Sequence, residues 1–294
     1  MPDRDGYIPG VPCWIDTHQQ DPEAAVAFYS GLFGWELEDV MPPGSEAEYF
    51  IARIRGGDVA AVGSNRGDAP ATWNTYVWVE SADETASRVR DAGGTTLMEP
   101  LDVMDFGRMA VFADPEGAAF CVWEANEHKG ARIVNEAGSL NFNGLNTRDA
   151  QGARSFYGAV FGWDTLTLEG GAEMWTLRGY GDHLEQGNPD LRKQHAEAGA
   201  PAGFEDVVAA LAPIPDDQPD IVPHWNVTFA VDDADAIAAK TTELGGKVIV
   251  PPFDAPWVRM TVLADPQGAT FIASKFVPEN RDLAARTDAA ASAA

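Results

Sequence analysis

The chain has 294 residues, of which 45% are hydrophobic, and its formal net charge is −26. This length predicts about two domains, and the apolar content is that of a globular protein with buried cores. Lys and Arg are not clustered, so the charge argues against nucleic acid or an anionic membrane surface as partners. No apolar run approaches the roughly 20 residues that a membrane-spanning helix needs.

The N-terminus and the cysteines indicate a cytoplasmic protein. Residues 1–5 carry no apolar segment after a basic one, so they do not resemble a signal peptide. Cys13 and Cys121 are the only cysteines and lie far apart in the sequence. In a chain that is not secreted, we expect both thiols to be free.

The first predicted unit consists of a strand, a helix and three further strands. Alternation along the first strand places Trp14, Asp16 and His18 on one face. The helix begins at Asp21, a good N-cap that is followed by proline, and ends at Gly34. After the strand at 13–18 and this helix, the predicted strands are 35–39, 49–54 and 59–62.

The second predicted unit repeats this order. Its helix begins with a capping box, Ser81 with Glu84 three residues later, and ends at the glycines 93–94. The turn Asp114-Pro115-Glu116-Gly117 separates its last two strands. The predicted strands of this unit are 74–79, about 95–98, 108–113 and 119–123.

The second half of the chain follows a polar linker at 126–138. A third unit begins with a strand at 139–145 and repeats the first helix after Asp149, and a fourth opens with a strand at 224–229 and ends with one at 269–275. Between them lies an inserted stretch, about 179–223, that is rich in Pro, Asp and Gly and holds one helical pattern at 204–211. A loop of this length suits a lid or a surface ornament equally well.

Two phrases occur twice, and they indicate that the halves are homologous. The segment 28–35, Phe-Tyr-Ser-Gly-Leu-Phe-Gly-Trp, returns at 156–163 as Phe-Tyr-Gly-Ala-Val-Phe-Gly-Trp. The segment 108–117, with Arg-Met and Asp-Pro-Glu-Gly, returns at 259–268 with Asp-Pro-Gln-Gly. Repetition of this kind predicts four β-α-β-β-β units in two pairs. Because one such unit cannot bury its own sheet face, each pair is expected to enclose a cup, a common ligand site.

These motifs resemble the vicinal oxygen chelate superfamily, which contains glyoxalase I, bleomycin-resistance proteins, fosfomycin-resistance enzymes and extradiol dioxygenases. The resemblance covers about residues 11–278. It implies an α+β fold of four βαβββ units paired into two glyoxalase-like domains, each a curved mixed sheet enclosing a cup. We expect these domains at 8–127 and 137–278, the second with the inserted loop at about 179–223, and a tail at 279–294 that is disordered toward its end.

The resemblance also implies where a metal would bind. The superfamily takes His, Gln or Glu ligands from the first strand of each unit and from near the end of its last strand. The matching positions of this chain hold Trp14, Asn74 and Cys121 in the first half, and Phe142, Asn226 and Ile272 in the second. These side chains do not make a transition-metal site, so we expect no metal, no other cofactor, and no extradiol dioxygenase activity. His18 and His224 lie on the same strand faces as these positions. If the alignment to the superfamily is shifted by two residues, either histidine comes nearer the cup, and a divalent metal is then an alternative.

Alternation gives the expected lining of each cup. The first would carry Trp14, Asp16, Asn74, Tyr76, Trp78, Cys121 and Trp123. The second would carry Phe142, Gly144, Asn146, His224, Asn226, Thr228, Trp257, Arg259 and Ser274. Such aromatics are either plain core or a surface on which a planar ligand stacks. Asn and Asp among them favour a ligand, since an unpaired buried polar group costs about 1–3 kcal/mol.

Some of these residues have two interpretations. His224 is the best candidate for proton transfer, because histidine is the usual proton carrier at neutral pH. Asp16 is a second acid–base candidate, or it holds a cationic group of a ligand. Arg259 repeats Arg108, and either binds a neighbouring loop or clamps a carboxylate or phosphate. Cys121 has apolar neighbours and no evident basic partner, so its thiol is expected to pack rather than react.

Three functions are compatible with the sequence. The first is a metal-independent binding protein of the bleomycin-resistance kind for an aromatic or planar metabolite. The second is a glyoxalase-like lyase, isomerase or hydrolase that acts on a small metabolite. The third is a structural or interaction protein whose cups are merely cores. Since paired units build a cup within one chain, a monomer suffices, and a homodimer is the alternative.

Overall fold

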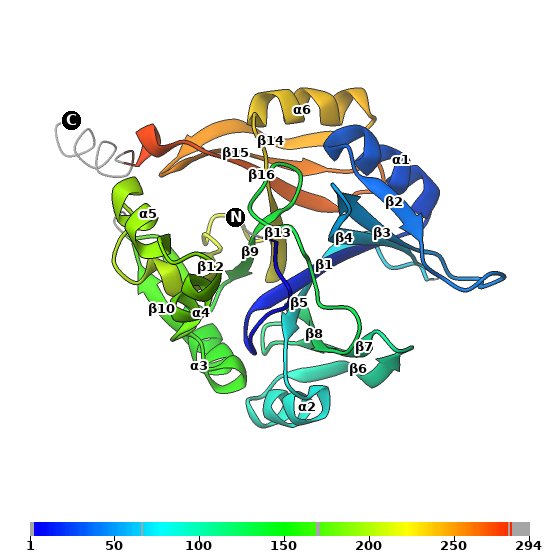
Figure 1. Cartoon of the computed structure of the whole chain (residues 1–294), viewed down its shortest axis with the longest axis horizontal. Coiled ribbons are helices and arrows are strands. Elements are labelled where there is room, and N and C mark those ends of the chain that lie inside the picture. Colours follow the sequence, from blue (N-terminus) through cyan, green and yellow to red (C-terminus); the bar gives the residue numbers. More distant parts are fainter. Residues whose placement is uncertain (1–2, 66, 169–170, 282, 284–294) are drawn as a thin grey trace.

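The computed structural model describes residues 3–65, 67–168, 171–281 and 283. It contains two mixed eight-stranded sheets, so the predicted α+β fold of four βαβββ units in two pairs is confirmed. Sheet A has the strand order β2-β3-β4-β1-β5-β8-β7-β6, and sheet B the order β10-β11-β12-β9-β13-β16-β15-β14. The order is the same in both, as the internal repeat requires (Figure 1).

Sheet A is built from the first two units. The first unit holds β1 (Pro12–Gln19), α1 (Pro22–Phe33), β2 (Glu36–Asp39), β3 (Tyr49–Ile54) and β4 (Gly57–Ser64). The second holds β5 (Thr72–Trp78), α2 (Ala82–Asp91), β6 (Thr95–Val103), β7 (Gly107–Ala113) and β8 (Ala119–Ala125). The two units meet at β1 and β5, which pair antiparallel.

Sheet B is built from the last two units. The third unit holds β9 (Leu140–Thr147), α3 (Ala150–Phe161), β10 (Asp164–Thr167), β11 (Glu173–Thr176) and β12 (Val207–Pro213). The fourth holds β13 (His224–Ala230), α6 (Ala234–Glu243), β14 (Lys247–Ala255), β15 (Val258–Ala264) and β16 (Thr270–Phe276), and the 3-10 helix η2 (Pro278–Asn280) follows it. Of the predicted tail, 282 and 284–294 lie outside the described residues.

The repeated helix has the same local cause in both halves. Asp21 and Asp149 each accept a hydrogen bond from a backbone N–H of the first turn, at 2.9 and 2.8 Å. Gly34 and Gly162 end the helices in the left-handed conformation, with φ of 72° and 73°. A residue with a Cβ is strained there, so the glycines stop both helices at matching points.

The inserted stretch differs from the prediction in one element. The apolar pattern at 204–211 is not a helix: only the 3-10 helix η1 (Phe204–Asp206) forms, and β12 begins directly after it. β12 pairs with β11 and β9, and this pairing buries the segment. The free energy gained by burial in the sheet outweighs the helical spacing of its apolar residues. The extra residues of the third unit instead form α4 (Tyr180–Gly187) and α5 (Leu191–Ala198), between β11 and β12.

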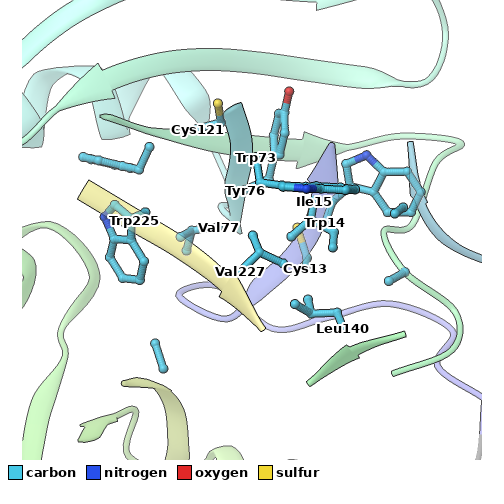
Figure 2. Close-up of a cluster of buried hydrophobic side chains, with 14 of the residues drawn as sticks. Cys13, Trp14, Ile15, Trp73, Tyr76, Val77, Cys121, Leu140, Trp225 and Val227 are labelled. Carbon is cyan, nitrogen blue, oxygen red and sulfur yellow. The ribbon is translucent and has the colours of Figure 1, made fainter. Parts of the chain in front are cut away.

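The two sheets pack back to back. β5 contacts β13, and Thr75 Oγ1 donates a hydrogen bond of 2.8 Å to Asn143 Oδ1 between the buried strands. Figure 2 shows Cys13, Val77 and Val227 gathered between β1, β5 and β13. The opposite face of each sheet, which points away from the other sheet and from α1, α2, α3 and α6, is called its inner face below.

The repeated phrase lies at this domain interface. Tyr29, on α1 of the first domain, donates a hydrogen bond of 2.9 Å to Asp265 of the second, and Trp73 Nε1 donates to the Tyr29 hydroxyl at 3.1 Å. The other oxygen of Asp265 accepts the backbone N–H groups of Gln267 and Ala269, both at 2.9 Å. We call Trp73, Tyr29 and Asp265 the first interdomain lock.

The second interdomain lock is its counterpart in the other direction. Tyr157, on α3 of the second domain, donates a hydrogen bond of 3.1 Å to Asp114 of the first. Trp225 Nε1 in turn donates to the Tyr157 hydroxyl at 2.9 Å. The Phe-Tyr phrase and the Asp-Pro-x-Gly turn, which are far apart in each half, are therefore partners across the interface.

Candidate functional site

The inner face of sheet A is filled by side chains and by the chain segment that links the domains. Trp14, Tyr76 and Cys121 are all less than 5% exposed. The ring of His128, from the predicted linker, meets the ring of Trp14 edge-on at 4.4 Å, and Trp123 Nε1 donates to the His128 carbonyl at 2.9 Å. His128 of the linker thus covers the part of the first predicted cup that holds Trp14 and Trp123.

Asp16 lies at the centre of this face, and its carboxylate is fully engaged. Asn74 Nδ2 donates to one oxygen at 2.8 Å, and the hydroxyls of Tyr76 and Tyr49 donate to the other at 2.8 and 3.0 Å. His18 Nε2 lies 3.4 Å from that second oxygen. Burial alone would raise the pKa of Asp16, but His18 and the hydrogen bonds outweigh it and hold this pKa below its usual range.

The Asp16–His18 pair predicts a pH dependence of stability. The Asp16 carboxylate raises the pKa of His18 to about 8, against a smaller opposing effect of burial. Protonated His18 therefore stabilises the fold fully below about pH 6.5, the ordinary value, and this contribution is lost as the pH rises through 8. Because 45% of the side chain is exposed, solvent screening keeps it below about 1 kcal/mol. Urea unfolding of His18→Gln at pH 6 and pH 8.5 should show a smaller difference than wild type; an unchanged difference would contradict this account.

The other predicted residues of the first cup lie on the same face or at its end. Trp14 Nε1 donates to the Tyr49 hydroxyl at 3.2 Å, which ties it to the Asp16 cluster. Burial raises the pKa of the Cys121 thiol far above its usual range, which keeps the thiol protonated. Trp78 is half-buried at the end of β5, with its ring 6.1 Å from that of Tyr7.

The inner face of sheet B carries the predicted residues of the second cup in register. Along β13, His224 lies opposite Asn146, Asn226 opposite Gly144, and Thr228 opposite Phe142. His224 and Asn226 are half-buried rather than covered. We call His224, Asn226 and Thr228 the β13 polar stripe. The groups beside it, which are mostly apolar, are Ala210 and Ala212 of β12, Phe142 of β9, Ile272 and Ser274 of β16, and Met260 and Val262 of β15.

His224 is held in one tautomer. Its Nδ1 lies 2.8 Å from the carbonyl oxygen of Val222, so this nitrogen carries the hydrogen. Its Nε2 lies 3.3 Å from Asn146 Nδ2, an amide donor, so this nitrogen is the acceptor. The single lone pair of Nε2 is thus directed at Asn146, and Nε2 can act as a general base only when that amide gives way to a substrate.

Asn226 is the central polar group of the stripe. Among the described residues its amide has no hydrogen-bond partner, and its side chain is half-buried. It fits because position 144 is a glycine: a Cβ there would lie only 3.0 Å from both Nδ2 and Oδ1 of Asn226. The amide thus offers one donor and one acceptor to a bound molecule.

Two residues predicted for the second cup are elsewhere. Arg259 lies on the outer face, where its Nε and Nη2 donate to Asp235 of α6 at 2.6 and 2.9 Å, and its Nη1 lies 3.2 Å from Asp254. The strand alternates, so Met260, not Arg259, shares the inner face with Ser274. Trp257 lies in the β14–β15 turn with φ of 70° and stacks on Phe276 at 6.2 Å.

The end of α5 reaches this turn. A Cβ placed on Gly199, which follows α5, would lie 3.4 Å from the Trp257 ring. The insertion therefore extends from β11 to the hairpin at the opposite edge of sheet B (Figure 1).

Two features were not predicted from the sequence. They are the apolar residues on the inner face of sheet B and the packing of His128 on the inner face of sheet A. Met260 and Val262 were identifiable, since they alternate with Arg259 along a predicted strand. Ala210 and Ala212 were not, because β12 carries no strand signal strong enough to separate it from a helix. No pattern in the polar segment 126–138 indicates that His128 covers Trp14, because that contact is made between distant elements.

The metal-ligand positions of the fold do not fit a metal. Within the described residues, no three His, Cys, Asp or Glu side chains come close enough to hold an ion. At the positions in sheet B, Phe142 and Ile272 offer only carbon, and Asn226 is a weak ligand for a transition metal.

No helix in the described part of the chain has the length and apolar character needed to cross a membrane.

Comparison with known proteins identifies both halves. Residues 14–123 match the model of the glyoxalase-like domain, and residues 139–272 match that of the glyoxalase/bleomycin resistance protein/dioxygenase superfamily. The protein named "Putative glyoxylase CFP32" of Mycobacterium tuberculosis is 39% identical over 285 residues, which cover 95% of this chain and 100% of that protein. The anthracycline biosynthesis protein DnrV of Streptomyces peucetius is 35% identical over 283 residues, which cover 90% and 93%.

Solved structures agree on the fold. The Mn(II)-bound glyoxalase of Novosphingobium aromaticivorans has a TM-score of 0.57 at 16% identity, covering 91% of this chain and 82% of that one. The 2,3-dioxygenase LapB of Pseudomonas sp. KL28 has a TM-score of 0.57 at 11% identity, covering 92% and 93%. By both family models and by relatives that span its length, the chain is a two-domain member of the glyoxalase/bleomycin resistance protein/dioxygenase superfamily.

Proposed function

We propose that this protein binds a small aromatic or planar metabolite on the inner face of sheet B, without a metal. The observation that carries the proposal is the difference between the two inner faces. In sheet A the polar side chains bond one another around Asp16, and His128 packs against the neighbouring rings of Trp14 and Trp123. In sheet B, Asn226 is half-buried and makes no such bond within the described residues. A half-buried amide among apolar groups is typical of a ligand site.

The name of one relative is consistent with a planar ligand. One of them is named an anthracycline biosynthesis protein, and anthracyclines are fused, planar ring systems. Phe142 and the aliphatic side chains beside the β13 polar stripe can contact such a ring on its faces.

Two further parts of the proposal concern the oligomeric state and the location. Because the face is built within one chain, a monomer is sufficient for binding. A cytoplasmic location is in keeping with the two buried free thiols.

Two equivalent asparagines provide a matched test. Asn226 on β13 corresponds to Asn74 on β5, which bonds Asp16. With 1,4-dihydroxyanthraquinone as the probe and EDTA in the buffer, Asn226→Leu should weaken binding at least about tenfold, because it removes a donor and an acceptor worth about 1–1.5 kcal/mol or more. Binding is measured by quenching of tryptophan fluorescence.

The control is Asn74→Leu, which should lower stability but leave the dissociation constant unchanged. If Asn74→Leu weakens binding and Asn226→Leu does not, the ligand lies in the first domain and the proposal is wrong. Binding that disappears in EDTA and returns with Mn²⁺ would overturn the metal-independent part alone.

A second candidate function is a glyoxalase-like lyase, isomerase or hydrolase. The tautomer of His224 favours it, because Nε2 carries the lone pair and could take a proton from a bound substrate that displaces the Asn146 amide. In such an enzyme His224 would be the base, and the Val222 carbonyl would orient it through Nδ1. Turnover that is lost in His224→Gln while probe binding persists would favour this function over binding alone. The third candidate, a structural protein, is supported only for the first domain, whose inner face is filled.

A further inference from the structure

The inner face of sheet B is made of uncharged groups. On its five central strands the side chains are aliphatic, aromatic, amide or hydroxyl, with the one imidazole of His224. The inner-face residues of these strands are Ala210, Ala212, Phe142, Gly144, Asn146, His224, Asn226, Thr228, Ile272, Ser274, Met260 and Val262. This composition differs from that of the whole chain, in which 22% of the residues are charged.

Three cations of the neighbouring strands and the insertion are turned away or already paired, and a fourth, Arg148, donates to the backbone carbonyls of Gln218 and Ile221. Arg259 and Lys275 pair with each other in register on the outer face, and Arg259 is bound by Asp235. In the insertion, Arg192 is bound to three carboxylates, those of Asp182, Glu185 and Glu205. An anionic ligand would thus lose its hydration against a face that offers hydrogen bonds but no cation. The net charge of −26 adds repulsion to that loss.

Three hydrogen-bonding groups of the face lie in a line along β13, and Asn146 and Ser274 lie on the strands beside it. Alternate residues of a strand are about 7 Å apart on one face, so the β13 polar stripe presents an imidazole, an amide and a hydroxyl in succession. Phe142 and Ala210 lie on one side of this line, and Ile272 and Met260 lie on the other. A flat ligand that carries hydroxyl or carbonyl groups along one edge matches this arrangement.

We infer that the ligand of this site is uncharged: a planar aromatic molecule with hydroxyl or carbonyl groups, such as a hydroxyquinone, and that the site discriminates against anions of the same shape. The inference rests on the proposed function and adds the chemical class of the ligand. It assigns the selectivity to the uncharged lining of sheet B rather than to the size of the site.

The test compares two probes that differ in one group. The neutral probe is 1,4-dihydroxyanthraquinone, and the anionic probe is its 2-sulfonate. The dissociation constants of both are measured on the full chain by fluorescence quenching at pH 7. We expect the sulfonate to bind at least tenfold more weakly. Equal binding would overturn the charge selectivity and leave the proposed function standing, whereas binding of neither probe would overturn both.

Two lysine variants separate the local charge from the net charge. Met260→Lys places a cation on the inner face of sheet B, and it should improve sulfonate binding at least tenfold. Leu97→Lys adds the same charge at an exposed position of the first domain, 57% accessible, and it should leave both constants unchanged. If Leu97→Lys improves sulfonate binding as much as Met260→Lys does, the selectivity comes from the net charge of the protein and the inference is wrong. Circular dichroism confirms that each variant is folded.

Discussion

Asp265→Ala is expected to lower the free energy of unfolding by about 3–5 kcal/mol. The carboxylate is 2% exposed and accepts four hydrogen bonds, which come from Tyr29, Gln19 and the backbone N–H groups of Gln267 and Ala269. Alanine would leave these donors buried without their acceptor, and an unpaired buried donor costs more than the lost bond itself. Urea unfolding followed by tryptophan fluorescence measures the effect.

The two interdomain locks give this prediction graded controls. Tyr29→Phe removes one donor to Asp265 and the acceptor of Trp73 Nε1, and it should cost about 2 kcal/mol, less than Asp265→Ala. Asp114→Ala, in the second lock, leaves three donors rather than four and should cost less than Asp265→Ala. A loss below about 1 kcal/mol for Asp265→Ala would show that water replaces its partners and that the lock contributes little to stability.

Asp16→Ala is expected to destabilise the protein by about 3 kcal/mol or more. It removes the acceptor of Asn74, Tyr76 and Tyr49, and it leaves His18 without its counter-ion. Urea unfolding measures this loss. Tyr76→Phe, which removes one donor of the same cluster, should cost about 1–2 kcal/mol and serves if the alanine variant does not fold.

The same variant tests the role that the sequence predicts for Asp16. If Asp16 is a structural centre, folded Asp16→Ala or Tyr76→Phe binds the dihydroxyanthraquinone probe as tightly as wild type, because the proposed ligand site is in the other domain. If instead Asp16→Ala keeps its stability but loses ligand binding or turnover, Asp16 is an acid–base or ligand-binding group, and the first domain holds the site.

Much of the fold could be predicted because the relevant signals are local. Asp21 and Gly34 mark the ends of a helix because they flank apolar residues at helical spacing. The same two residue types recur around the matching helix of the second half, which identifies the repeated units. Alternation also placed Trp14 and Asp16 on one face, and His224 and Asn226 on another. These are properties of a few neighbouring residues, and tertiary contacts did not reverse them.

The remaining features depend on contacts between distant segments. The phrase that contains Tyr29 was identifiable as a repeat, but nothing in it indicates that its hydroxyl binds Asp265, which lies 236 positions away. Likewise, the lining of a cup follows from alternation, whereas its cover does not, so the closure by His128 was not predictable. Arg259 was placed on the wrong face because a turn of uncertain length precedes it, and a shift of one residue reverses the face.

The crossed locks have a consequence for how the duplicated halves relate. Each tyrosine finds its acceptor only in the opposite copy, so neither copy carries a complete set of partners for its own helix. Separation of the halves would break the hydrogen bond between tyrosine and aspartate on both sides. The duplication has thus produced a mutual dependence, in which each copy supplies the acceptor for the tyrosine of the other. Under the proposed function, the first copy acts as the scaffold and the second carries the face that binds the ligand.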